Sequence, residues 1–84
     1  MAQQIRIALA DDHPLYLEGL EMLLNQSGIA KVVATAADGN EAAEMIAGHS
    51  FDILLLDLHL PNKDGMQIAE ELSDKNVPFK IIML

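Results

Sequence analysis

Three aspartates directly follow apolar runs that have the character of buried strands. Asp57 follows residues 53–56 (ILLL), and Asp11 and Asp12 follow residues 5–10 (IRIALA). An apolar run of this length is typical of a strand covered on both faces, as in a parallel sheet. Ligands of open α/β sheets bind at the carboxyl ends of the strands, so these acids are placed for chemistry. The plainer alternative is that Asp57 only caps the turn after its strand.

The three carboxylates together predict a cation site. If the strands of residues 5–10 and 53–56 are neighbours, they lie about 4.8 Å apart and the acids leave the same edge of the sheet. Carboxylates this close repel one another, and no Arg or Lys stands directly beside them in the sequence. A divalent cation that prefers oxygen ligands, Mg²⁺ above all, relieves this repulsion. The same ion would neutralise a phosphoryl group that passes to a carboxylate nucleophile.

The rest of the chain predicts the elements that position these acids. Apolar, β-branched runs predict four strands, at residues 5–10, 31–36, 53–56 and 80–84. Capping and turn residues predict three helices, which start at Pro14, after a cap at Asn40, and after Gly65. The order βαβαβαβ indicates an α/β fold with one parallel sheet, right-handed crossovers and helices on both faces. The sequence contains no linker or repeat, so residues 1–84 are expected to form one domain.

Apolar spacing predicts which side chains pack inside. The expected helix faces are Leu17, Leu20, Leu23 and Leu24, then Ala43, Ile46 and Ala47, then Met66, Ile68, Ala69 and Leu72. Four methionines are also expected to fill the core, namely Met22, Met45, Met66 and Met83. The histidines His13, His49 and His59 are too scattered in the sequence to predict a metal cluster, and their side chains are not expected to do chemistry.

Composition narrows the function classes. The chain has 84 residues and no cysteine, which excludes disulfides and thiolate chemistry within it. Its net charge of −8 disfavours binding to nucleic acid or to anionic lipid. No apolar run is long enough for a membrane span, and residues 1–4 lack the layout of a signal peptide. A cytoplasmic location is the expectation.

Two motifs resemble those of a known family. Residues 8–14 (ALADDHP) and 54–65 (LLLDLHLPNKDG) are similar to the two acidic motifs of the receiver domain of two-component response regulators. The sequence of residues 9–20 (LADDHPLYLEGL) is similar to the corresponding segment of regulators that carry a LuxR/NarL-type helix-turn-helix output domain. The resemblance runs from residue 5 to residue 84 and implies a flavodoxin-like, CheY-like fold.

The resemblance implies a role for each acid. Asp57 would accept a phosphoryl group from a sensor histidine kinase, and Asp12 would bind Mg²⁺ directly. Asp11 would support the ion through water, and the backbone carbonyl of His59 would complete the protein ligands. The domain would be a signalling switch rather than an enzyme, with at most slow autodephosphorylation. It would control a DNA-binding output domain elsewhere in the parent protein.

The family pattern continues beyond the last residue of this chain. Family members follow the fourth strand with a Ser or Thr, a further helix, a fifth strand that ends in Lys, and a closing helix. The chain is therefore expected to be a receiver domain truncated after its fourth strand, with an incomplete fold. The unpaired edge of an apolar strand can pair with another chain. The chain is therefore expected to form a homodimer or larger assembly through residues 80–84.

Two other functions remain open from the sequence. One is an interaction or dimerisation module that keeps the acids but cannot be phosphorylated. The other is a small Mg²⁺-dependent phosphohydrolase with Asp57 as nucleophile. The second is disfavoured because no further acid follows two residues after Asp57 as an acid–base partner, and no substrate-binding cap is encoded.

Overall fold

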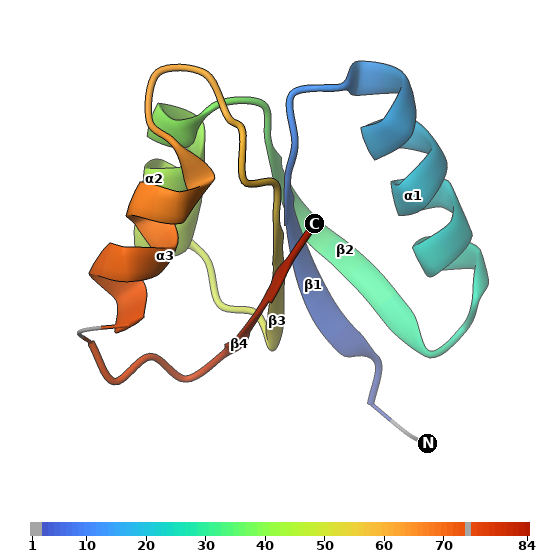
Figure 1. The fold of residues 1–84 in the computed structure, drawn as a ribbon. Coiled ribbons are helices and arrows are strands. Elements are labelled where there is room, and N and C mark those ends of the chain that lie inside the picture. The colour runs from blue at the N-terminus through green and yellow to red at the C-terminus, as the bar shows by residue number, and fades with distance from the viewer. Residues whose placement is uncertain (1–2, 74) are drawn as a thin grey trace.

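A computed structural model describes residues 3–73 and 75–84 of the chain as four strands alternating with three helices (Figure 1). The elements are β1 (Ile5–Ala10), α1 (Pro14–Gln26), β2 (Ala30–Ala36), α2 (Gly39–Gly48), β3 (Ile53–Leu56), α3 (Gly65–Ser73) and β4 (Lys80–Met83). The strands form one sheet in the order β2-β1-β3-β4, and every pairing is parallel. The predicted fold class is confirmed, with β1 and β3 side by side.

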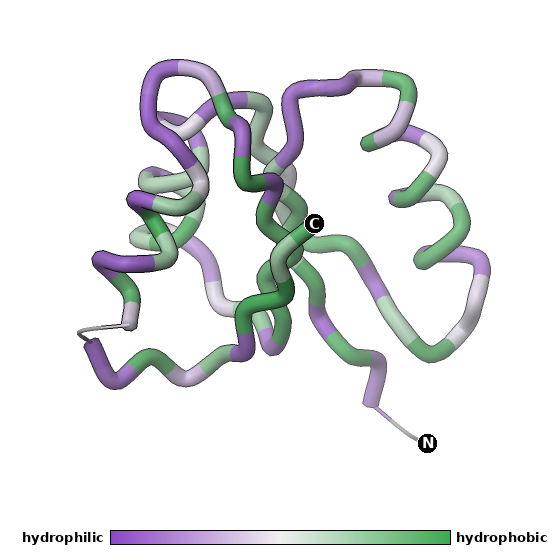
Figure 2. Tube along the Cα trace, in the orientation of Figure 1, coloured by the Kyte–Doolittle hydropathy of each residue, from purple (hydrophilic) through white to green (hydrophobic). Residues whose placement is uncertain are grey.

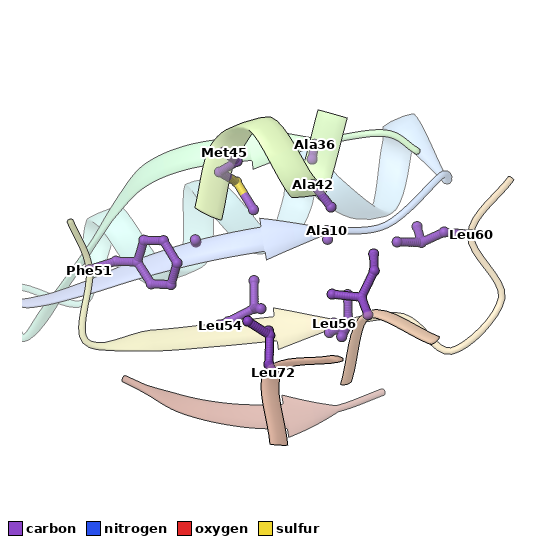
Figure 3. Close-up of a cluster of buried hydrophobic side chains, with 11 residues drawn as sticks. Ala10, Ala36, Ala42, Met45, Phe51, Leu54, Leu56, Leu60 and Leu72 are labelled. Carbon is purple, nitrogen blue, oxygen red and sulfur yellow. The ribbon is translucent and has the colours of Figure 1, made fainter. Parts of the chain in front are cut away.

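The helices cover the two faces of the sheet unequally, with α1 on one face and α2 and α3 on the other (Figure 1). Strand β1 serves both faces because its side chains alternate: Ala8 and Ala10 belong to the cluster under α2 and α3, whereas Ile7 and Leu9 belong to the cluster under α1. Figure 3 shows the larger cluster, in which Leu72 approaches Leu54 of β3. Hydrophobic residues concentrate along the strands; the loop after β1 is hydrophilic, whereas the loop after β3 alternates hydrophobic and hydrophilic residues (Figure 2).

Helix α1 lies on the sheet through part of its predicted stripe. Leu17, Leu20 and Leu24 are half-buried against the cluster of Ile7, Leu9 and Ala30. The fourth residue of the stripe, Leu23, was predicted wrongly, because it is 68% exposed. Positions 17, 20 and 24 follow one line along a helix, whereas position 23 is turned to its side.

Helix α2 begins and packs differently from the prediction. Its N-cap is Asp38, not Asn40: the Asp38 carboxylate accepts the backbone N–H of Glu41 at 2.7 Å. Its buried face contains Ala42 and Met45, while the predicted Ala43 and Ala47 are exposed. Alanines at neighbouring positions make it ambiguous from the sequence which side of the helix packs inside, and the observed helix is capped two residues earlier than predicted. The predicted Ile46 is half-buried against the core.

The methionine prediction holds at one position. Met45 is buried in the core, but Met22, Met66 and Met83 are 59%, 49% and 37% exposed. Met22 and Met66 lie on the outer sides of their helices, and Met83 lies on the outermost strand. The methionine side chain is flexible and unbranched, so it is accommodated at these exposed positions as readily as in a gap of the core.

The edge of the sheet at β4 is apolar and open. In the described part of the chain, β4 pairs only with β3. Ile82 and Leu84 are 46% and 44% exposed. The backbone N–H of Leu84 donates to the carbonyl of Leu56 at 2.9 Å, so the pairing with β3 extends one residue beyond the assigned strand. None of the helices described is long and apolar enough to cross a bilayer.

Candidate functional site

The register of the central strands brings two of the predicted acids together. Ala10 of β1 is the register partner of Leu56 of β3, so Asp11 and Asp57 are the next residues on neighbouring strands. The Asp57 N–H donates to the Ala10 carbonyl at 2.9 Å, and the Asp11 N–H donates to the Ala36 carbonyl of β2 at 3.0 Å. Both acids are therefore anchored by their backbones where the strands leave the core.

Asp12 completes a cluster in which the carboxylates differ in exposure. One side-chain donor atom each from Asp11, Asp12, His13 and Asp57 lies within 4.8 Å of the others. The side chain of Asp11 is 7% exposed, that of Asp57 14% and that of Asp12 35%. The cluster thus opens to solvent on the side of Asp12, with Asp57 reachable and Asp11 at the base.

The side chain of His13 joins the cluster, which the sequence interpretation missed. Its Nδ1 lies 2.6 Å from Asp11 Oδ1, 3.1 Å from Asp12 Oδ1 and 3.9 Å from Asp57 Oδ2. The hydrogen bond to Asp11 raises the pKa of His13 above its ordinary value of 6.5. The charges of Asp12, Asp11 and, least, Asp57 raise this pKa further, while desolvation opposes the rise. The signal was local: an Asp side chain commonly accepts the N–H two residues on, and Asp11 Oδ1 accepts that of His13 at 2.9 Å.

A close backbone approach shapes the loop that follows Asp57. The N–H of Gly65 donates to the carbonyl of Leu58 at 3.2 Å, and a Cβ at position 65 would overlap the Asp57 carbonyl oxygen. Glycine is therefore required here for close approach rather than for an unusual φ. The N–H of His59 donates to Asp57 Oδ1 at 3.1 Å, which orients the carboxylate. A ligand role for the His59 carbonyl stays a prediction.

The same loop is tied to the start of α2. Asn62 has a φ of 70°, a left-handed conformation that Asn adopts more readily than most residues. Its side-chain amide donates to Asp38 Oδ2 at 3.0 Å, while the other oxygen of Asp38 caps α2. The N–H of Gly39 donates to the Pro61 carbonyl at 3.0 Å. Helix α2 therefore holds the loop that carries His59.

The donor set of the cluster suits a hard divalent cation. Three carboxylates supply oxygen ligands, and the partial exposure of Asp12 and Asp57 leaves room for water or a phosphate oxygen. Apolar side chains of Leu15, Tyr16 and Leu84 border the depression beside Asp57. The arrangement combines a partly open nucleophile with a place for the charge that balances an incoming phosphoryl group.

The family model for the response regulator receiver domain matches residues 7–84, and the chain belongs to this family. Receiver domains of response regulators are signalling domains rather than enzymes, and they generally bind Mg²⁺ at an acidic cluster. The chain is thus a receiver domain of a two-component response regulator, and the acidic cluster is consistent with its phosphorylation site.

The sequence relatives include regulators of the NarL and NreC type. The chain is 37% identical over 82 residues to the "Probable transcriptional regulatory protein NarL" of Mycobacterium tuberculosis, covering 98% of this chain and 38% of that protein. It is 38% identical over 81 residues to the oxygen regulatory protein NreC of Staphylococcus epidermidis, covering 95% of this chain and 37% of the relative. The chain therefore spans less than two fifths of these relatives. Receiver domains of NarL-type regulators interact with histidine kinases.

Solved structures agree with this assignment. The signal receiver domain of the M. tuberculosis response regulator NarL superposes with a TM-score of 0.89 at 36% identity, over 98% of this chain and 66% of that one. The response regulator domain of Thermotoga maritima CheB gives a TM-score of 0.86 at 28% identity, over 96% of this chain and 60% of that one.

Proposed function

We propose that Asp57 is the residue that accepts a phosphoryl group from a sensor histidine kinase. The observation that carries the proposal is the convergence of Asp11, Asp12 and Asp57 at the carboxyl ends of the neighbouring strands β1 and β3. Asp57 is the member that a phosphate can reach while its backbone stays fixed, because its side chain is partly exposed and its N–H is bonded to β1. The alternative, that Asp57 only caps a turn, does not explain why two further carboxylates meet it.

The reaction needs no other nucleophile. A carboxylate oxygen of Asp57 attacks the phosphorus of a phosphohistidine, an O–P bond forms, and the P–N bond breaks. The released imidazole keeps the electron pair and takes a proton from solvent. The N–H of His59, which donates to Asp57 Oδ1, holds the carboxylate in one orientation during the attack. Slow hydrolysis of the acyl phosphate would return the domain to its starting state.

All three acids would hold the magnesium ion that the family generally binds, with Asp57 a ligand as well as the phosphoryl acceptor. We assign Asp12 as a direct ligand because it is the most exposed of the three carboxylates. Asp11 is buried and accepts two hydrogen bonds from His13, so it supports the ion through water. The backbone carbonyl of His59 is assigned as the remaining protein ligand. When bound, the ion neutralises charge on the transferring phosphoryl group.

The parent regulator is proposed to act in the cytoplasm on DNA through a separate output domain. This part of the proposal rests on relatives that are named as transcriptional or oxygen regulatory proteins and that are longer than this chain. The net charge of −8 argues against DNA binding by residues 1–84 themselves. We also propose that the chain self-associates through β4, because its outer edge is apolar and Ile82 and Leu84 are exposed.

Phosphorylation by a small acyl phosphate tests the proposal without the unknown kinase. Intact mass spectrometry should show the mass of one added phosphoryl group in the presence of Mg²⁺, and Asp57→Asn should abolish it. Asp64→Asn is the matched control, since Asp64 is also in the loop after β3 but caps α3 through Met66 N–H, a role that Asn can keep. Equal labelling of wild type and Asp57→Asn would contradict the proposal, and no labelling of the wild type would favour an interaction module.

A further inference from the structure

The loop that joins β3 to α3 is held at both ends and at one point between them. At its start the N–H of Asp57 is bonded to β1, and at its end the N–H of Gly65 donates to the Leu58 carbonyl at 3.2 Å. Leu60 holds the loop from inside, because its side chain is buried in the core cluster. The exposed corner that follows, residues 61–62, lies outside these anchors.

The start of α2 holds this corner. The side-chain amide of Asn62 donates to Asp38 Oδ2 at 3.0 Å, and the N–H of Gly39 donates to the Pro61 carbonyl at 3.0 Å. Gly39 also lies so close to the loop that a Cβ there would overlap the carbonyl oxygen of Lys63. The position of the corner therefore follows the position of the first turn of α2.

The bond between Asp38 and Asn62 uses groups that are free for this contact. One carboxylate oxygen of Asp38 caps α2 by accepting the N–H of Glu41 at 2.7 Å, which leaves the other oxygen for Asn62. A hydrogen bond to a charged acceptor is stronger than one between neutral groups. The φ of 70° at Asn62 is a conformation that Asn adopts more readily than most residues. A single carboxylate thus connects the helix cap to the loop.

We propose that Asp38 and Asn62 are positioning residues for the phosphorylation of Asp57. The inference rests on the proposed function and adds to it two residues that touch neither the phosphoryl group nor the metal. Asn62 is three residues after His59, whose N–H orients the Asp57 carboxylate and whose carbonyl is the assigned metal ligand. If the corner loses its bond to α2 and shifts, this short segment shifts with it, and the acceptor loses its fixed orientation.

A competing explanation is that the bond serves only the helix. In that case Leu60 and Gly65 are sufficient to hold the loop, and breaking the bond lowers the stability of α2 without any effect at Asp57. A positioning role, by contrast, changes phosphorylation and metal binding in a chain that is still folded.

Variants that remove the bond from either side separate the two explanations. Asp38→Ser keeps a hydroxyl oxygen for the cap and loses the second oxygen, which accepts from Asn62. Asn62→Gly removes the amide and keeps a residue that tolerates the left-handed backbone. Asp38→Asn is the conservative variant, because its amide can cap the helix and still donate to the Asn62 oxygen. Asp52→Ser is the matched control: its carboxylate also joins distant segments, by accepting the N–H of Arg6 at 2.8 Å, but directly before β3 rather than after it.

Labelling by an acyl phosphate in the presence of Mg²⁺ and calorimetric titration of Mg²⁺ measure the effect at the site. We expect Asp38→Ser and Asn62→Gly to slow labelling and to weaken Mg²⁺ binding by about three- to tenfold each, the effect of losing one hydrogen bond. The double variant should lose no more than either single variant, because both changes remove the same bond. Asp38→Asn and Asp52→Ser should keep the wild-type values.

The NMR shift of the His59 amide proton in the metal-free chain gives a further readout, since it reports the bond of this N–H to Asp57. It should change in Asp38→Ser and Asn62→Gly and stay constant in Asp52→Ser. Circular dichroism and urea unfolding confirm that each variant is folded under the assay conditions. Folded variants that label, bind Mg²⁺ and keep the His59 shift as the wild type does would overturn the inference, and so would an equal effect of Asp52→Ser. A wild-type chain that is not labelled and binds no Mg²⁺ would instead contradict the proposed function.

Discussion

Substituting Gly65 by Ala should disturb the acceptor loop although it adds only one methyl group. A Cβ at this position would overlap the carbonyl oxygen of Asp57 and stand 2.9 Å from its carbonyl carbon and 3.1 Å from the Leu58 Cα. These neighbours are backbone atoms, so a rotamer change cannot relieve the overlap. Either α3 or the residue that carries the acceptor carboxylate must shift, at a cost of about 1–3 kcal/mol in the free energy of unfolding.

The same substitution at Gly19 supplies the matched control. Gly19 is inside α1, and no described atom outside the local helix would meet its Cβ within 4 Å. Replacing it by Ala should stabilise the chain by about 0.5–1 kcal/mol, because glycine loses more backbone entropy in a helix. The two single-methyl changes should therefore differ in sign.

Two assays check this expectation. Urea unfolding measures the free energies of the two variants and wild type. The rate of labelling by an acyl phosphate measures the acceptor, and a displacement of about 1 Å should slow it on the order of 10²-fold in Gly65→Ala. Gly19→Ala should label at the wild-type rate. If Gly65→Ala is as stable as Gly19→Ala and is labelled as fast, the close approach does not position Asp57 and the reasoning is wrong.

Three further predictions concern the cap, the core and the cluster. Asp38→Ala should lower the unfolding free energy by about 1–2 kcal/mol, because the carboxylate that it removes both caps α2 and binds the β3–α3 loop; an unchanged urea midpoint would contradict this. Met45→Ala should cost about 2–5 kcal/mol because Met45 is buried, whereas Met22→Ala, at a site 59% exposed, should cost far less; equal losses in thermal melts would refute the packing. In the metal-free chain, NMR titration should give His13 a pKa above 6.5 because of its bond to Asp11, and Asp11→Asn should lower it. The pKa of His13 is higher in the folded than in the unfolded chain. The bond to Asp11 therefore stabilises the fold fully below about pH 6.5, and this stabilisation is lost as the pH rises through the pKa of the folded state. A measured His13 pKa at or below 6.5 would contradict the contact.

The sheet and the acid cluster could be predicted because their signals are local and strong. The run of residues 53–56 has no polar interruption, so it fits a strand buried on both faces, and the acid after it must lie at the strand end. Because connections between parallel strands are almost always right-handed, few strand orders are possible for this chain. In the observed order β1 lies beside β3, which brings Asp11 and Asp57 together.

The details that the sequence left open depend on contacts between distant segments. Asp38 and Asn40 are both good caps by type, and the bonds of Asp38 and Gly39 to Asn62 and Pro61 favour the earlier one. Alanines at positions 42 and 43 are equally apolar, so the packed face of α2 follows from where the helix starts. The position of His13 is different, because it follows from a local contact, the bond from its N–H to Asp11 two residues earlier, which the sequence interpretation overlooked.

Peptide mapping of the phosphorylated chain tests the central claim most directly. The chain is treated with an acyl phosphate, with Mg²⁺ or with a chelator, and the modified residue is located by tandem mass spectrometry. The account predicts one phosphoryl group, on Asp57, in the Mg²⁺ sample and none with the chelator. A phosphoryl group on another residue, or labelling of Asp57 that is equal with and without the metal, would contradict it.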